Sequence, residues 1–343
     1  MSAIYNLSKM KSVTIRDVAK AAGVSVATVS YVLNNSGRVG RPTRRAVLSA
    51  VRNLDYVANL NARNLAKDVS QTLGMIVSDI ENPFFPEVIK GFEQRAREQT
   101  YDVILSDTNY DSAVLAEAAT RMLQQRVRGI SFITSEVAMA TIRQIKARQT
   151  PAVFLDVGPV QQYISNVKID YAHGIRAVID HLVSLGHRRI SFVGARNDLQ
   201  SNAARRDAYL HYMLDLGIKV GTVLEGNSHF DGGLAAGAAI CQLVPRPTAV
   251  MANNDLTAIG IIKALQSSGL NVPKHISVTG FDCTQLAAYT TPSLTTVDLK
   301  RDLIGRIAAE ALQALFSSPT HVGQEYPIIP NLIVGQSTGK AGR

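Results

Sequence analysis

The chain has 343 residues, too many for one compact core, and its net charge of +9 is unevenly distributed. Residues 1–70 contain eleven Lys and Arg against three acidic residues, a net +8, so residues 71–343 are close to neutral. The hydrophobic content of 46% excludes a disordered chain. A basic segment joined to a near-neutral body indicates a polyanionic partner for the segment and a different partner for the body.

Cysteine usage and hydropathy limit the compartment. Cys241 and Cys283 lie far apart and form no CxxC pair, so we expect neither a disulfide framework nor a metal site. The N-terminal run MSAIYNLSKMK lacks the apolar core of a signal peptide. No uncharged apolar run reaches the ~20 residues that span a bilayer. We therefore expect a cytoplasmic chain with no membrane partner.

Three short helices are predicted in a row within the basic segment. The first begins after Thr14, which with Asp17 forms the pattern of a capping box. The second begins after Ser25 and runs to Asn34, and the gap of about three residues between these two helices is typical of a helix-turn-helix. The third follows Pro42. Its predicted apolar face consists of Val47, Leu48, Val51 and Leu54.

The second helix would present a small outward face to a DNA major groove. Val26 and Ala27 suit thymine methyl groups, and Tyr31 suits a base edge or a phosphate. Short polar groups that suit phosphate oxygens are carried by Ser25, Thr28, Ser30 and Asn34. From these residues alone, a generic three-helix bundle with a solvated face remains equally open.

A family resemblance favours DNA binding. The segment Val13–Asn59 resembles, without a gap, the headpiece of the LacI/GalR family of bacterial transcription regulators. Its sequence is VTIRDVAKAAGVSVATVSYVLNNSGRVGRPTRRAVLSAVRNLDYVAN. The VSxxTVSxVLN core is highly specific to that family. The resemblance implies base contacts by Val26, Ala27 and Tyr31, where many members carry Arg or His at the last position. It implies contacts to groove edges or phosphates by Ile15, Arg16, Ser25, Thr28, Ser30, Asn34, Arg38, Thr43, Tyr56 and Asn59.

The next segment, Asn59–Lys67, is by itself a weak polar helix or a linker. The resemblance makes it a hinge helix that becomes ordered only on DNA. It implies that Leu65 of each subunit wedges into the minor groove, that Ala62 lets paired hinges approach, and that Arg63 lies beside them. Such a wedge exchanges base stacking, a few kcal/mol per step, for a bent site with more contacts. The family often has Pro at the position of Ala58. The Ala in this chain weakens the stop between the headpiece and the hinge.

Residues 71–343 alternate short β-branched runs with amphipathic stretches. The predicted strands are Leu73–Val77, Val103–Ser106, Gly129–Ile133, Ala152–Leu155, Ile190–Val193, Ala249–Met251 and Ile276–Val278. The predicted helices include Phe84–Gln99, Ser112–Gln125, Ala172–Leu185 and Leu256–Ser268. This alternation predicts an α/β body with parallel sheets, in which a ligand binds at the carboxyl ends of the strands.

Enzyme motifs are absent from the sequence: it has no GxGxxG after a strand, no GxxxxGK[ST] and no HExxH. One GxSxG occurs at Gly335–Gly339, but no room remains there for the helix of a nucleophile elbow, so we interpret it as a chance match. His187 is expected to have a structural role. Because Asp255 and Asp282 follow predicted strands, spacing alone does not exclude an enzyme, but we expect none.

The body resembles the effector domain of the same family in the phrases SDIENPFFPEVIKGFEQRARE, LGHRRISFVG, ANNDLTAIGIIKAL, ISVTGFD and PSLTTVDL. That domain is similar to sugar-binding periplasmic proteins. The resemblance implies an all-α helix-turn-helix headpiece (12–58), a hinge helix and linker (59–70), and a two-subdomain α/β effector and dimerisation domain (71–343). The N-subdomain would hold about 72–169 plus a segment after 300, and the C-subdomain about 170–300 plus the tail.

The resemblance also implies an effector site between the subdomains. Arg205 matches the residue that grips the effector, Asn254 and Asp282 match polar ligands of hydroxyl groups, and Phe230 matches an aromatic that stacks on the effector ring. Further candidates are Asp79, Phe85, Asp156 and Asn202. A core role for Phe230, a turn cap by Asp282 and an ion pair of Arg205 with Asp207 remain open. A sugar, a sugar phosphate or a purine would suit these residues.

Together these features predict a nucleoid-associated bacterial repressor that binds palindromic double-stranded DNA and a small-molecule effector, without cofactor or metal. A palindrome contacted by one headpiece per half-site requires a homodimer. The resemblance places the dimer face on the helix after Pro83 and around Tyr289–Pro292. Because the C-terminal tail has no heptad run of Leu, we do not expect a tetramer. Control by a nucleoside or a protein coregulator remains open. A transport solute-binding protein would need export and no basic head.

Overall fold

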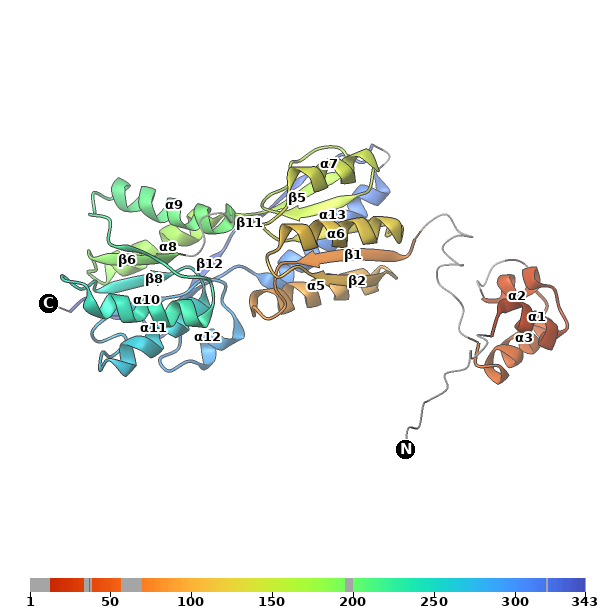
Figure 1. Cartoon of the computed structure of the whole chain (residues 1–343), viewed down its shortest axis with the longest axis horizontal. Coiled ribbons are helices and arrows are strands. Elements are labelled where there is room, and N and C mark those ends of the chain that lie inside the picture. Colours follow the sequence, from red (N-terminus) through yellow and green to blue (C-terminus); the bar gives the residue numbers. More distant parts are fainter. Residues whose placement is uncertain are drawn as a thin grey trace, which may run out of the picture. The chain divides into compact units, whose positions relative to one another are not determined.

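The computed structural model describes residues 13–33, 37, 39–56, 70–194, 200–318 and 320–342 (Figure 1). The chain divides into two compact units, Met1–Ser70 and Gln71–Arg343. The first unit is all-α and the second combines helices with parallel sheets. The predicted α/β class with an all-α headpiece is therefore confirmed.

The first unit contains α1 (Ile15–Ala22), α2 (Val26–Leu33) and α3 (Arg41–Asn53). Both predicted caps are present. The backbone N–H of Thr14 donates to the Asp17 carboxylate at 2.8 Å, and the N–H of Thr28 donates to Ser25 Oγ at 3.1 Å. Capping of this kind fixes where each short helix begins, because it satisfies backbone donors that the first turn leaves unpaired.

The three helices bury a small apolar core in which Val18, Val29 and Val47 are fully inaccessible to solvent. The prediction for α3 was wrong at Leu48, whose side chain is 40% exposed. Residues 47, 50, 51 and 54 follow the spacing of one helical face, whereas residue 48 is turned about 100° away from residue 47. Ala50 therefore occupies the buried position that the sequence analysis assigned to Leu48.

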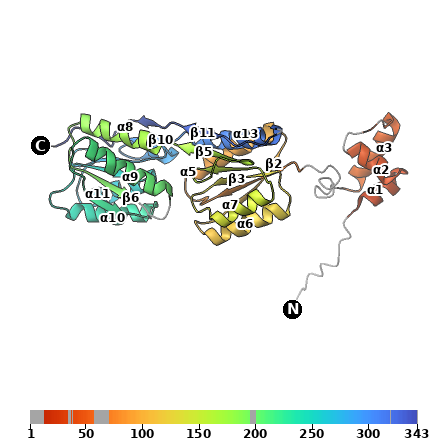
Figure 2. The same ribbon diagram turned by 90° about the horizontal axis from the view of Figure 1, so that it is seen from above.

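The second unit contains two sheets, and we call each sheet with its helices a lobe. The N-lobe is built on a six-stranded parallel sheet in the order β11-β5-β4-β3-β1-β2. Its strands are β1 (Thr72–Val77), β2 (Asp102–Asp107), β3 (Gly129–Ile133), β4 (Ala152–Leu155), β5 (Ile164–Ile169) and β11 (Glu325–Ile328). Figure 2 shows α5 (Phe84–Glu98) and α13 (Arg301–Ser317) on one face, with α6 (Ser112–Gln124) and α7 (Met139–Ala147) on the other.

The C-lobe is built on a four-stranded parallel sheet in the order β7-β6-β8-β9, accompanied by the antiparallel pair β10–β12. Its strands are β6 (Ile190–Gly194), β7 (Val223–Glu225), β8 (Ala249–Ala252), β9 (Ser277–Thr279), β10 (Thr296–Asp298) and β12 (Asn331–Ile333). In Figure 1, α8 (Tyr171–Ser184) and α9 (Gln200–Asp215) cover one face, and α10 (Phe230–Gln242) and α11 (Asp255–Ser267) cover the other. A short helix, α12 (Gln285–Tyr289), follows β9.

The chain passes between the lobes three times, after β5, after β10 and between β11 and β12. All seven predicted strands and all four predicted helices overlap observed ones. Strands β5, β7 and β10 to β12 were not predicted from the sequence, and helices α7, α9, α10, α12 and α13 are not among the helices named there. The strands next to these crossings, β5, β10, β11 and β12, are therefore among the elements that local patterns did not predict.

Candidate functional site

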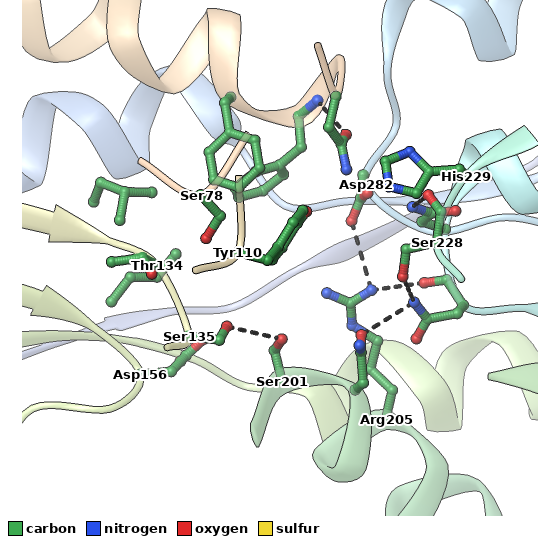
Figure 3. Close-up of a pocket in the computed structure, with 18 of the residues that line it drawn as sticks. Ser78, Tyr110, Thr134, Ser135, Asp156, Ser201, Arg205, Ser228, His229 and Asp282 are labelled. Carbon is green, nitrogen blue, oxygen red and sulfur yellow. Dashed lines mark hydrogen bonds and ion pairs between the residues drawn. The ribbon is translucent and has the colours of Figure 1, made fainter. Parts of the chain in front are cut away.

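A cavity of about 310 Å³ lies where the carboxyl ends of strands from both lobes face each other (Figure 3). On the N-lobe side, Ser78 follows β1, Thr134 follows β3 and Asp156 follows β4. On the C-lobe side, Asn254 follows β8 and Asp282 follows β9. This is the position at which parallel α/β sheets bind ligands, because the loops there are not needed for strand pairing.

Arg205 extends from α9 into the centre of this cavity and is only 8% exposed. Its guanidinium carbon lies 4.9 Å from the ring centres of both Tyr171 and Phe281. One terminal nitrogen donates to the Asn253 carbonyl at 2.7 Å and lies 3.9 Å from an Asp282 carboxylate oxygen. Aromatic faces and an acid thus hold the charged plane in one orientation.

Two buried polar atoms of this pair are without a hydrogen-bond partner among the described residues. They are Arg205 Nε and Asp282 Oδ1. A buried polar atom without a partner is costly, so a ligand that supplies one is bound more favourably. The alternative pairing of Arg205 with Asp207 does not occur, because Asp207 accepts from the neighbouring Arg206 at 3.0 and 2.9 Å.

Burial perturbs both carboxyl groups of the cavity. It raises the pKa of Asp282 to about 7, although the Arg205 charge opposes the rise. Burial also raises the pKa of Asp156, whose oxygens accept from the Ile169 N–H and the Tyr171 hydroxyl at 2.8 Å each. The site therefore holds two acids that respond to hydrogen bonds from an incoming ligand.

Most of the effector residues expected from the sequence line this cavity. They are Phe85, Asp156, Asn202, Arg205, Asn254 and Asp282. The amide of Asn254 also has a structural task, since its oxygen accepts from the Thr257 N–H at 2.9 Å and caps α11. Its nitrogen donates to the Ser228 carbonyl at 2.8 Å.

Phe230 and Asp79 are not among the residues that line the cavity. Phe230 is the first residue of α10 and is 40% exposed, while the preceding Ser228 and His229 face the cavity instead. Asp79 is buried, and its carboxylate accepts from the Glu81 N–H at 2.8 Å to close a turn. The aromatic surface of the cavity comes from Phe84, Phe85, Tyr110 and Tyr171.

Several polar cavity residues were not found from the sequence, among them Ser78, Tyr110, Thr134, Ser135 and Ser201. The serines at 135 and 201 share a hydrogen bond of 3.2 Å that joins the loop after β3 to the start of α9 (Figure 3). This bond links the two lobes directly beside Arg205. The available signal was position, since Ser78 and Thr134 directly follow strands that the sequence did predict.

In the first unit, α2 presents the outward face that the sequence predicted. Val26 is 40% and Tyr31 is 50% exposed, and Ala27 and Arg16 are also exposed. Ile15 and Tyr56 are partly buried against the small core, and Ser30 and Thr43 are half-buried. The expected DNA contacts Asn34, Arg38, Asn59, Ala62, Arg63 and Leu65 lie outside the described residues.

The GxSxG match and His187 both have structural roles. Ser337, in the GxSxG match, is buried; its hydroxyl donates to the Val278 carbonyl at 2.6 Å and accepts from the Thr295 N–H at 2.8 Å. His187 is bonded through its two ring nitrogens to Thr248 Oγ1 and the Gly339 carbonyl, at 2.9 Å each. Within the described ranges, no three His, Cys, Asp or Glu side chains come together as metal ligands, and no helix is long and apolar enough to cross a membrane.

Family models of known proteins match a segment of each of the two units. The family model of "Bacterial regulatory proteins, lacI family" matches residues 14–59, and that of a periplasmic binding protein-like domain matches residues 179–338. Catabolite control protein A of Priestia megaterium is 32% identical over 90% of this chain and 94% of its own length. The chain belongs to the LacI family.

Other members of the LacI family match over nearly their whole length. The ribose operon repressor of Escherichia coli (strain K12) is 30% identical over 93% of this chain and 98% of its own. A crystal structure of the lac repressor dimer, bound to operator and an anti-inducer, superposes with a TM-score of 0.85 at 27% identity, covering 96% of this chain and 100% of that one. These relatives are transcriptional regulators and not enzymes.

Proposed function

We propose that this LacI-family chain is a transcriptional repressor whose affinity for operator DNA is controlled by a small molecule bound between the two lobes. One observation carries the proposal. The same chain holds a helix-turn-helix with an exposed face and a polar cavity formed by facing strand ends. The first feature suits a major groove, and the second suits a small ligand that contacts both lobes.

The proposed DNA-binding unit comprises residues 12–58 with the hinge segment 59–70. Val26, Ala27 and Tyr31 would contact base edges from α2, because their side chains are exposed. Ser25 would combine capping with phosphate contact, since its hydroxyl is at the N-terminus of α2. Leu65 would enter the central minor groove, as the family resemblance implies.

The proposed regulatory unit comprises residues 71–343 and acts as a homodimer, as the lac repressor does in its operator complex. Effector binding would change the angle between the lobes and thereby the spacing of the two hinge segments. Arg205, Asp282, Asp156 and Asn202 would bind the effector, because all four line the cavity. Since its target is chromosomal DNA, we place the protein in the bacterial cytoplasm at the nucleoid.

Selection of bound duplexes from a randomised pool by the full chain tests this proposal. We expect enrichment of a palindromic site with a central flexible step. Tyr31→Ala should weaken binding to the selected site, by about 1–3 kcal/mol for a base contact. Asn53→Ala, at the exposed end of α3, is the matched control. Absence of any enriched sequence, or equal effects of the two variants, would contradict the proposed role of α2.

A further inference from the structure

A second cavity, of about 220 Å³, lies at the amino ends of the C-lobe strands, and we call it the C-lobe cavity. It is at the opposite edge of the sheet from the cavity between the lobes. Because β7, β6 and β8 are parallel neighbours, the turns that precede them meet at this edge. These turns bring Arg188, Arg189 and Lys219 to one opening, and no acidic side chain is among the described residues that line it.

The wall of the C-lobe cavity also contains a buried polar group. Ser191, the second residue of β6, lines the cavity and is only 2% exposed. Its hydroxyl has no hydrogen-bond partner among the described residues, which is uncommon for a buried polar group. Gly221 keeps the turn that carries Lys219 close to this strand, since a Cβ at position 221 would overlap with the Ile190 carbonyl.

Part of the positive charge at this edge has a structural role, because helix C-termini carry partial negative charge. Arg188 donates to the Val183 carbonyl in the last turn of α8 at 3.1 Å. Arg246 donates to the Cys241 carbonyl in the last turn of α10 at 2.8 Å. Arg189 donates through Nε to the Arg246 carbonyl at 3.3 Å, so its two terminal nitrogens stay available.

The charge that remains exceeds what the helix ends can offset. None of the four cations Arg188, Arg189, Lys219 and Arg246 forms an ion pair with an acid in the described part of the chain. Asp215, the acid nearest to Lys219 in the sequence, does not line the cavity. A helix C-terminus is equivalent to roughly half a negative charge, so the ends of α8, α9 and α10 offset only about one or two of these positive charges. An anion with about two charges would remove most of the remaining repulsion.

We infer that the C-lobe cavity binds a small organic dianion, a phosphate monoester or a dicarboxylate, separately from the effector site between the lobes. Arg189 and Lys219 would bind its charged oxygens, and Ser191 would donate its hydroxyl hydrogen. Val220 and Leu243, which also line the cavity, would contact a short carbon skeleton. The volume of about 220 Å³ is below the ~300 Å³ at which sites for drug-sized ligands begin, which limits the ligand to a few carbon atoms.

Isothermal titration calorimetry of the full chain at constant ionic strength tests the inference. The probes are glycerol 3-phosphate and succinate, at about pH 7.5, where a phosphate monoester carries close to two charges. Acetate is the monoanionic control. We expect at least one dianion to bind saturably at one site per chain, and which of the two binds distinguishes a phosphate from a dicarboxylate ligand. No saturable binding of either dianion, or equally tight binding of acetate, would overturn the inference.

Lys219→Gln tests the location of the site, because it removes one charge from an exposed turn. We expect this variant to bind the active dianion about tenfold more weakly, the effect of losing one charge-assisted hydrogen bond. Lys274→Gln is the matched control, since Lys274 is an exposed lysine before β9 that does not line the cavity. Equal affinities in the two variants would place the anion elsewhere, in the cavity between the lobes or on the basic first unit, and would overturn the inference.

An acidic peptide is titrated beside the dianions to test for a larger partner. Val244, which lines the C-lobe cavity, is 94% exposed, and only a ligand larger than a few carbon atoms would cover it. Binding of a short peptide of Asp and Glu, without binding of either dianion, would overturn the inference in favour of a protein partner. None of these titrations involves DNA, so the repressor proposal stands or falls separately.

Discussion

Replacing Asp282 by Asn removes a carboxyl group that makes the stability of the protein depend on pH. Burial raises the pKa of Asp282 from an ordinary value of 3.8 to about 7. Between these two values the folded chain binds a proton that the unfolded chain has released, so the free energy of unfolding falls as pH rises. From pH 5 to pH 8 the loss amounts to about 2–3 kcal/mol for this single group.

The measurement is Tm of the full chain and of Asp282→Asn across that pH range. We expect Tm of the unaltered chain to fall, relative to the variant, by roughly 5–10 °C between pH 5 and pH 8. Asp255, whose pKa burial raises to about 6, is present in both proteins, and its charge contributes to the raised pKa of Asp282. Asp215→Asn, an exposed change at the end of α9, should follow the unaltered chain. Parallel profiles for the unaltered chain and Asp282→Asn would refute a raised pKa for Asp282.

Three further substitutions test a helix cap, a buried core position and a buried hydroxyl group. Ser25→Ala removes the cap of α2, and we expect the first unit to lose about 1 kcal/mol of stability, measured by urea unfolding, with a parallel loss of DNA affinity. Val29→Ala opens a fully buried position and should unfold the first unit at lower urea while the thermal transition of the body stays unchanged. Tyr209→Phe deletes a hydroxyl that donates to the Ile190 carbonyl at 2.8 Å and accepts from the Gly221 N–H at 3.1 Å. A fall in the free energy of unfolding of less than about 0.5 kcal/mol would contradict the buried, hydrogen-bonded role of this hydroxyl.

The elements that the sequence predicted are those whose local pattern matches their tertiary surroundings. The strand Gly129–Ile133 is entirely buried and was found with its observed bounds, because a short apolar run is what a central parallel strand requires. The strand Ile164–Ile169 was missed because Ser165 and Asn166 are polar yet buried in it. β11 was missed because it contains Pro327 and pairs as an edge strand with a segment far away in the sequence.

Helix α10 was missed for a different reason. Its sequence, FDGGLAAGAAICQ, contains three glycines, which lower helix propensity. The structure requires at least one of them, since a Cβ at Gly233 would lie 2.2 Å from the Thr257 carbonyl of α11. Close packing of two helices therefore overrides local preference, and no pattern within residues 230–242 indicates the partner.

For the cavity, the family resemblance supplied Arg205, Asp282 and Asp156, which line it. It did not supply Ser78 or Thr134, which also line the cavity. The hydrogen bond from Ser78 to Glu136 joins residues 58 positions apart, so it emerges only in the folded chain.

The three passages of the chain between the lobes set an order in which the protein can assemble on the ribosome. The N-lobe sheet lacks its outer strand until β11, at residues 325–328, has been synthesised, and the C-lobe pair β10–β12 waits for residues 331–333. The three headpiece helices, which have a hydrophobic core of their own, are complete by residue 53. At ~5–20 residues per second, roughly 14 to 56 s separate these events. For that interval each new molecule carries the three complete headpiece helices, while the N-lobe sheet and the C-lobe pair each still lack a strand.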